Sequence, residues 1–117
     1  MPNNVEQGMR GQQAAEAFLL DKGWHIIEKN FRARTGEIDL IAKDGAYTVF
    51  VEVKSRRQLR YGYPRESVTG RKQARIKKTA LCYISKKRIT NQDFRFDVVE
   101  VLYDQGQEYI SHIENAF

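Results

Sequence analysis

The sequence lacks the features that would place a protein outside the cytoplasm or in a membrane. It has one cysteine, Cys82, which excludes an intramolecular disulfide and fits a reducing compartment. No apolar run approaches the roughly 20 residues that a membrane helix needs. The N-terminus has no basic start followed by an apolar stretch, as a signal peptide would. We therefore expect a cytoplasmic protein that does not contact a membrane.

Linkers, repeats and the commonest nucleotide-binding and hydrolase motifs are also missing. The chain has two prolines, no low-complexity tract and no internal repeat, so its 117 residues are expected to form one domain, 1–117. It contains no P-loop, dinucleotide fingerprint or nucleophile elbow. With 41% hydrophobic and 30% charged residues, the composition is that of an ordinary globular protein and does not favour disorder.

Charge is present in abundance, and its two signs are separated along the chain. Residues 54–88 contain thirteen Lys or Arg and a single acid, Glu66, whereas the remainder has seven basic and fourteen acidic residues. This segregation gives local net charges of +12 and −7 within an overall +5. A concentrated positive segment indicates a polyanionic partner whose phosphates contact Lys and Arg. The alternative is a basic helix that only keeps the protein in solution.

Apolar spacing and turn signals predict two helices and five strands. The first helix is expected over 5–22, with Gly23 as its C-cap, and the second runs to about residue 86 from Thr69 as its N-cap. Strands are expected at 24–34, 37–43, 46–54, 93–103 and 108–113, with a loop at 58–66. A hairpin followed by a helix-linked strand predicts an α/β fold with a mixed sheet flanked by helices.

The central hairpin carries acidic residues where a sheet would normally avoid them. A two-residue turn at 44–45 would place Asp39 opposite Phe50 and Glu37 opposite Glu52. Since residues i and i+2 share a face of a strand, Glu37, Asp39, Glu52 and Lys54 would then lie on one side, with Ile38 and Leu40 on the other. Asp39 and Glu52 would be diagonal neighbours, roughly 7–8 Å apart.

Clustered carboxylates repel one another, so they need a compensating positive charge. Lys54 provides part of it, and a divalent cation would provide more. An all-oxygen site favours Mg²⁺ or Mn²⁺ over zinc. The alternative is a network of ion pairs on a hydrated face of the sheet.

The motifs around these residues resemble a known family. Gly11-X₄-Glu16-X₆-Gly23-Trp24, Asn30-Phe-Arg-Ala-Arg, Gly36-Glu-Ile-Asp-Leu-Ile-Ala, Phe50-Val-Glu-Val-Lys-Ser-Arg and Arg95-Phe-Asp-Val-Val-Glu-Val are similar to those of the YraN family of bacterial proteins. That family is similar in turn to archaeal Holliday junction resolvases, which are nucleases of the PD-(D/E)XK superfamily. The resemblance implies a restriction-endonuclease-like αβββαβ core. Here Ile38 replaces the proline that names the signature.

The resemblance also implies roles for individual residues. Asp39 and Glu52 would bind the metal together with the backbone carbonyl of Val53, and Lys54 would orient or activate the attacking water. Glu16 would support the metal from the first helix. Gln73 matches a polar position on the second core helix of the resolvases. Glu37 leaves open which carboxylate of the second strand binds metal more directly.

Candidate nucleic-acid contacts fall into two groups. Basic and aromatic residues near the ends of the hairpin could hold the backbone and stack on bases: Arg32, Arg34, Arg56, Arg57, Arg60, Tyr61, Tyr63 and Arg65. Others lie on the second helix: Arg71, Lys72, Arg75 and Lys78. We expect these to contact phosphates, since no DNA-reading motif accompanies them. The alternative for the first group is an ordinary basic loop.

Three remaining residues are expected to be structural. His25 and His112 lack metal-ligand spacing, and Cys82 lies in an apolar stretch that predicts a buried thiol. The leading hypothesis is a metal-dependent endonuclease acting on structured or damaged DNA in repair or recombination. A non-catalytic nucleic-acid-binding module and an accessory subunit that needs a partner are the alternatives. The resolvases of this fold act as dimers, so the resemblance leaves room for a homodimer.

Overall fold

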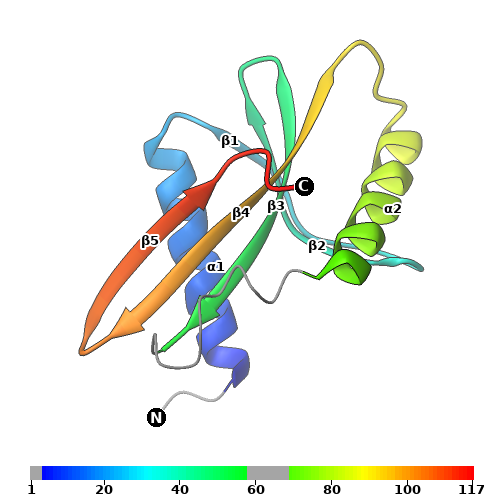
Figure 1. Ribbon diagram of the computed structural model, residues 1–117. Helices are drawn as coiled ribbons and strands as arrows, with labels where there is room; N and C mark the ends of the chain where they lie inside the picture. Colours follow the sequence, from blue (N-terminus) through cyan, green and yellow to red (C-terminus); the bar gives the residue numbers. More distant parts are fainter. Residues whose placement is uncertain (1–3, 58–68) are drawn as a thin grey trace.

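One sheet lies between two helices in the computed structural model, which describes residues 4–57 and 69–117 (Figure 1). Within these residues the elements are α1 (Asn4–Asp21), β1 (His25–Ala33), β2 (Gly36–Asp44), β3 (Tyr47–Arg56), α2 (Gly70–Lys87), β4 (Asp93–Asp104) and β5 (Gln107–Ile113). The predicted α/β class and the αβββαβ order of a restriction-endonuclease-like core are confirmed, and the additional last strand is present.

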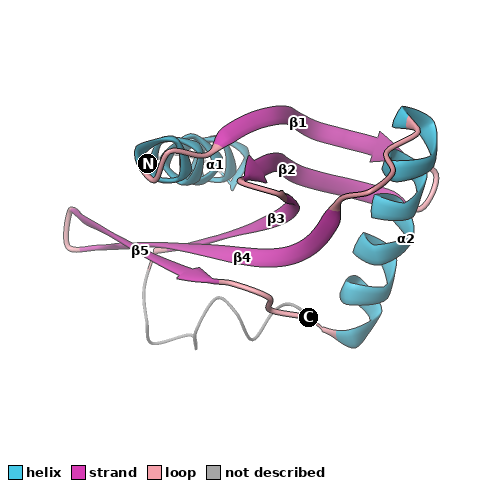
Figure 2. Ribbon diagram, turned by 90° about the horizontal axis from the view of Figure 1, so that it is seen from above, coloured by secondary structure: helices cyan, strands magenta, loops and turns pink. Residues whose placement is uncertain are grey.

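The sheet is mixed, and its strands follow the order of the chain. The spatial order is β1-β2-β3-β4-β5, with β3 and β4 parallel and the other neighbours antiparallel. The parallel pair requires a crossover, and α2 lies on this connection, as Figure 2 shows. The two helices cover opposite faces of the sheet, so the central strands are buried on both sides.

The helix α1 ends in a Schellman motif that fixes its approach to the sheet. Gly23 adopts φ +89 and its N–H donates to Leu20 O at 2.9 Å, while the N–H of Trp24 donates to Leu19 O at 3.1 Å. Trp24 is 6% exposed and packs in the same core as Leu19 and Ala15. That core continues over the sheet residues Leu40, Ala42, Val49, Val51, Val99 and Val101.

The helix α2 is capped as predicted and buries one stripe on the other face. Thr69 accepts a hydrogen bond from the Lys72 N–H at 3.3 Å, and Ile76, Thr79, Ala80 and Tyr83 are buried. They pack with Phe31, Ile38, Ile41 and Phe50. Cys82 is exposed, so the prediction of a buried thiol was wrong. Cys82 lies within the apolar stretch of the sequence, but it is outside the stripe of helix residues that faces the sheet.

The predicted turn of the central hairpin was wrong by two residues in register. Asp44 pairs with Tyr47, so the turn residues are Gly45 and Ala46, and Gly45 has φ +58. Val49 therefore pairs with Ala42, not with Leu40. A shift of two residues preserves the alternation of side chains between faces, so the clustering of the acidic residues does not depend on this error.

The predicted face of Ile38 was also wrong. Ile38 packs on the α2 side with its pairing partner Phe31, whereas Leu40 packs on the α1 side. Strict alternation would have put Ile38 and Leu40 on the same face. The break coincides with Asn30 on β1, which has φ +54, a left-handed conformation that few side chains adopt.

A buried ionic cluster that the sequence did not suggest joins β4 to the C-terminal segment. Asp97 is 0% exposed and accepts hydrogen bonds from Arg95 Nε at 2.9 Å and the Asn115 N–H at 3.0 Å, and its Oδ2 lies 2.8 Å from His112 Nε2. Burial raises the pKa of Asp97, but the hydrogen bonds from His112, Arg95 and Asn115 outweigh it and hold the pKa below its usual value. His112 thus has the structural role predicted, whereas His25 is exposed.

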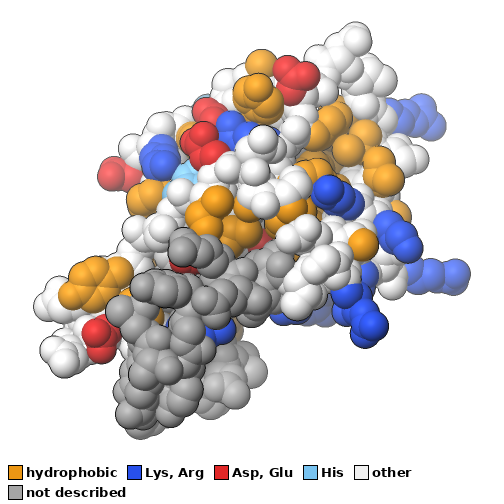
Figure 3. All heavy atoms as spheres, viewed as in Figure 1, with side chains coloured by type: hydrophobic (Ala, Val, Ile, Leu, Met, Phe, Trp, Pro, Cys, Tyr) orange, Lys and Arg blue, Asp and Glu red, His pale blue; other side chains and the backbone are white. Residues whose placement is uncertain are grey.

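The outer face of α2 is strongly basic, and its Lys and Arg side chains gather at the right of Figure 3. Its exposed basic residues are Arg71, Lys72, Arg75, Lys77, Lys78, Lys86 and Lys87. The helix contains no acidic residue to neutralise them. Neither helix within the described ranges is apolar enough over its length to cross a bilayer.

Candidate active site

Asp39 lies where β2 and β3 begin to separate. Their pairing runs from Asp44 and Tyr47 to Leu40 and Val51. Beyond it, the Asp39 side chain replaces the ladder, and its Oδ2 accepts the Val53 N–H at 2.8 Å. This bond holds the Asp39 carboxyl next to Glu52, the residue that precedes Val53.

Glu52 and Lys54 form the other half of the cluster on β3. Their side chains are 16% and 14% exposed, and Glu52 Oε1 lies 3.9 Å from Lys54 Nζ. The structure therefore brings together Asp39, Glu52 and Lys54, as the sequence predicted. Glu52 and Lys54 are two residues apart on β3, and the hydrogen bond from the Val53 N–H between them to Asp39 on β2 completes the group.

Burial strongly perturbs both carboxyls. It raises the pKa of Glu52 to about 8, helped by the negative charge of Asp39 and opposed by Lys54. Burial also raises the pKa of Asp39, although hydrogen bonds from Val53 and Glu52 and the charge of Lys54 act in the other direction. When two carboxyls are in contact, ionising both at neutral pH costs free energy unless additional positive charge is present.

The cluster has an acceptor that no described group satisfies. Glu52 Oε2 is buried and receives no hydrogen bond from the described residues. A buried oxygen in that state is costly unless a proton or a cation reaches it. Two carboxyls in contact offer oxygen ligands only, which suits a hard divalent cation that completes its shell with water. Among the described residues, no group of three or more His, Cys, Asp or Glu has the geometry of a metal site.

Lys72 reaches the same cluster from the first turn of α2. Burial lowers the pKa of Lys54, and the hydrogen-bonded side chain of Lys72 lowers it further, while Glu52 acts in the opposite direction. Lys72 also lines a small cavity together with Glu37, Glu52 and Arg75. The sequence had assigned Lys72 to phosphate binding, and the structure brings it next to Glu52 and Lys54.

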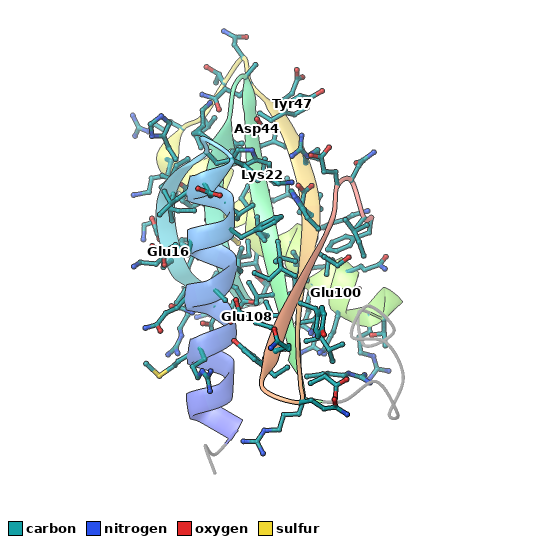
Figure 4. All side chains as sticks on the ribbon, turned by 90° about the vertical axis from the view of Figure 1, so that its left-hand side faces the viewer. Glu16, Lys22, Asp44, Tyr47, Glu100 and Glu108 are labelled. Carbon is teal, nitrogen blue, oxygen red and sulfur yellow. The ribbon has the colours of Figure 1, made fainter. Side chains whose placement is uncertain are left out.

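Glu16 faces the cluster across a larger cleft between α1 and the sheet. The cleft has a volume of about 650 Å³, and Glu16, Asp39 and Lys54 all line it. Glu16 projects from the middle of α1 (Figure 4), where its Oε1 lies 3.4 Å from Lys29 Nζ. The structure thus groups Glu16 with the predicted metal ligands, although it lies more than 20 residues before them in the chain.

Glu37 lies at the margin of this group. Its Oε1 accepts a hydrogen bond from Asn30 Nδ2 at 3.1 Å, and its Oε2 lies 3.4 Å from Arg32 Nε. The Val53 N–H donates to Asp39 instead. Gln73 is half-buried on α2, one turn before Ile76.

The predicted nucleic-acid contacts are distributed over two regions of the surface. Arg32 on β1 and Arg34 in the turn after it are exposed. Arg56 at the end of β3 and Arg57 after it are half-buried, and both interact with other residues. Arg71, Lys72, Arg75 and Lys78 are exposed on α2. Arg60, Tyr61, Tyr63 and Arg65 lie outside the described residues.

The sequence analysis missed several residues of the cleft, among them the polar residues Gln12, Asn30 and Ser55. Gln12 is four residues before Glu16, so helical spacing alone places both on one face of α1 and could have identified it. Asn30 belongs to the Asn-Phe-Arg-Ala-Arg motif, but nothing in that motif predicts its left-handed backbone. Ser55 directly follows Lys54 and is reached only because α1 approaches β3.

Comparison with known proteins places the chain in a family. A family model described as "Uncharacterised protein family UPF0102" matches residues 11–101. The chain belongs to the UPF0102 family. A UPF0102 protein of Trichlorobacter lovleyi is 49% identical over 116 residues, covering 97% of this chain and 91% of the relative. UPF0102 proteins of Caldicellulosiruptor saccharolyticus and Clostridioides difficile are 44% and 47% identical, and each match covers 98% of this chain and 99% of the relative. The family resemblance seen in the motifs, UPF0102 being the YraN family, is confirmed.

Proposed function

We propose that this protein is a metal-dependent endonuclease that hydrolyses phosphodiester bonds in structured or damaged DNA, in repair or recombination in the cytoplasm. One observation carries the proposal: Asp39 and Glu52 are half-buried in contact beside Lys54, and the buried Glu52 Oε2 receives no hydrogen bond from the described residues. A purely structural ion pair would not need two carboxyls that destabilise each other's charge.

Asp39 and Glu52 would hold the cation, with the Val53 carbonyl as a third protein ligand. We propose Mg²⁺, or Mn²⁺ in its place, because all three ligands are oxygens. When bound, such a cation stabilises negative charge on the phosphate and makes its water more acidic.

The remaining residues position the substrate and the water. Lys54 holds the attacking water and adds a fixed positive charge beside the phosphate, where charge develops in the transition state. Glu16, facing Asp39 across the cleft, supports the metal through water. Gln73 contributes a polar group from α2.

The substrate backbone would lie along α2 and the ends of the hairpin. The exposed basic residues of α2 begin at Arg71 and include Lys72, which contacts the cluster, and no acidic residue interrupts them along the helix. Phosphates on this surface would release counterions from the DNA, so binding should weaken steeply with salt. The basic residues near the ends of the hairpin and the neighbouring tyrosines would make the remaining contacts with the DNA. A homodimer, as in the resolvases, would present two such sites to a branched substrate.

A cleavage assay on four DNA structures tests the proposal directly. Linear duplex, single strand, flap and four-way junction are each incubated with purified protein and Mg²⁺, Mn²⁺ or EDTA. We expect metal-dependent cutting of at least one of them, and a loss of at least about 10²-fold in Glu52→Gln, the scale of removing one preorganised electrostatic contact.

Glu108→Gln is the matched control, because Glu108 is an exposed carboxylate on β5. It should cut like the wild type. Circular dichroism of Glu52→Gln must show a folded protein. Full activity in Glu52→Gln would refute the proposed site, and salt-sensitive binding without cutting on every substrate would favour a non-catalytic or partner-dependent role.

A further inference from the structure

The cleft beside the catalytic cluster differs chemically from the basic surface of α2. Its four charged lining residues are two acids, Glu16 and Asp39, and two lysines, Lys29 and Lys54, so their formal charges cancel. Glu16 and Lys29 also form an ion pair with each other. A run of phosphates would gain little from such a surface. The cleft is therefore suited to a polar ligand without net charge.

Side-chain amides give this cleft a hydrogen-bonding edge. Gln12 Nε2 donates to Asn30 Oδ1 at 2.9 Å, and Asn30 Nδ2 donates back to Gln12 Oε1 at 3.1 Å. Gln12 keeps one N–H and one carbonyl lone pair after this pairing. Gln13, on the next position of α1, is exposed and lines the same cleft.

The backbone is shaped to hold this edge in place. Asn30 has φ +54, and the second hydrogen bond of its Nδ2, to Glu37 Oε1 at 3.1 Å, fixes the amide from the other side. A left-handed non-glycine residue within a strand is a strained feature that persists where the surroundings enforce it. The Ser55 hydroxyl is buried at the cleft and has no hydrogen-bond partner among the described residues.

We infer that the cleft binds one unstacked nucleobase of the substrate, next to the phosphate held at Asp39 and Glu52. The carboxamide of Gln13 offers an adjacent donor and acceptor that match the paired donor and acceptor on a base edge, as adenine presents them, and Gln12 adds one further hydrogen bond. The volume of about 650 Å³ falls within the roughly 300–1,000 Å³ of pockets that enclose small organic ligands. Val53 and the adaptable thioether of Met9 supply apolar contact for the base.

This inference rests on the proposed function, and it narrows the substrate class. A base inside a regular duplex cannot reach a pocket without leaving the stack, which costs a few kcal/mol in paired DNA and least where the base is already unpaired. The substrate is then a nucleic acid with an unpaired nucleotide beside the cleaved bond. A fully paired duplex is disfavoured by the cost of extruding the base.

The test is binding to a DNA duplex that carries one bulged 2-aminopurine nucleotide, against the same duplex fully paired, with EDTA present so that nothing is cut. We expect the bulged duplex to bind about tenfold more tightly, the scale of one two-bond base contact. Its fluorescence should rise on binding, because the base leaves the stack and none of the described lining residues is aromatic to quench it. An RNA duplex with the same bulge is measured in parallel and shows whether the pocket takes its nucleotide from DNA or from RNA.

Gln12→Met keeps the length and helix propensity of the side chain while removing both hydrogen-bonding groups. It should reduce the preference for the bulge without weakening binding to the paired duplex. Gln13→Ala, at an exposed position, removes the two-bond contact and should abolish the preference. Asn91→Gly, an exposed amide with φ +58 beyond the C-terminal end of α2, is the control and should bind like the wild type.

The outcomes separate this inference from the proposed function. Equal binding of both duplexes by the wild type overturns the base pocket while leaving nucleic-acid binding intact. A preference that both Gln12→Met and Gln13→Ala retain also overturns it. If neither duplex binds at any salt concentration, the proposed function fails as well.

Discussion

Gly11 lies where α1 closely approaches β3, and its replacement by alanine tests the packing that positions Glu16. A Cβ added to Gly11 would lie 2.8 Å from Ser55 Cβ and 2.9 Å from Ser55 Oγ. The hydroxyl could rotate away, but Ser55 Cβ is fixed by the β3 backbone. Gly11→Ala therefore requires α1 to move away from β3.

Gly8 provides a matched comparison on the same helix, because a Cβ there would meet nothing within 4 Å. Alanine is favoured over glycine inside a helix by about 0.8–1 kcal/mol. Gly8→Ala should gain up to that amount, less any fraying near the helix start. Gly11→Ala gains the same propensity but also overpacks the interface, which typically costs about 1–3 kcal/mol. We expect the two variants to differ by ~2 kcal/mol in their free energies of unfolding.

Urea denaturation at neutral pH measures this difference. With a slope of about 1–3 kcal/mol per molar urea, ~2 kcal/mol separates the two unfolding midpoints by about 1 M. Gly11→Ala should also reduce the proposed nuclease activity, because Glu16 lies on the helix that must shift. If Gly11→Ala is as stable as Gly8→Ala, the close contact between α1 and β3 is wrong, and with it the geometry of the cleft.

Three further predictions follow from charge and exposure. The pKa of Asp97 lies below its usual 3.8, so the stability it contributes is present above that value and is lost as pH falls toward its folded pKa. Asp97→Asn should therefore be less stable than the wild type by ~3 kcal/mol in urea at pH 6, with the gap narrowing at pH 3; a constant gap would contradict the ionic origin. Arg71→Ala with Lys78→Ala should reduce the slope of log affinity against log salt by about 0.9 per lost phosphate contact on duplex DNA, whereas Lys22→Ala should leave it unchanged. Exposed Cys82 should react with a thiol reagent in the native protein nearly as fast as in urea; protection of the native thiol would contradict the described orientation of α2.

Most of the fold could be predicted from the sequence because its signals are local. The cap at Thr69, the Schellman glycine at Gly23 and the period of apolar residues each depend on neighbours within one or two turns. The catalytic candidates could be predicted for a similar reason. Glu52 and Lys54 are two residues apart on one strand, and Asp39 precedes them across a single short turn, so a two-residue error in register preserved their clustering.

What the sequence determined by itself is therefore the order of the elements, the family and the acidic cluster with its lysine. Only the tertiary structure decided the rest: the face of Ile38, the exposure of Cys82, the burial of Asp97 with His112, and the amide pair of Gln12 with Asn30. Each of these depends on contacts between segments far apart in the chain. Local propensity contains no term for such contacts, since whether a side chain is buried, paired or turned is determined by what packs against it.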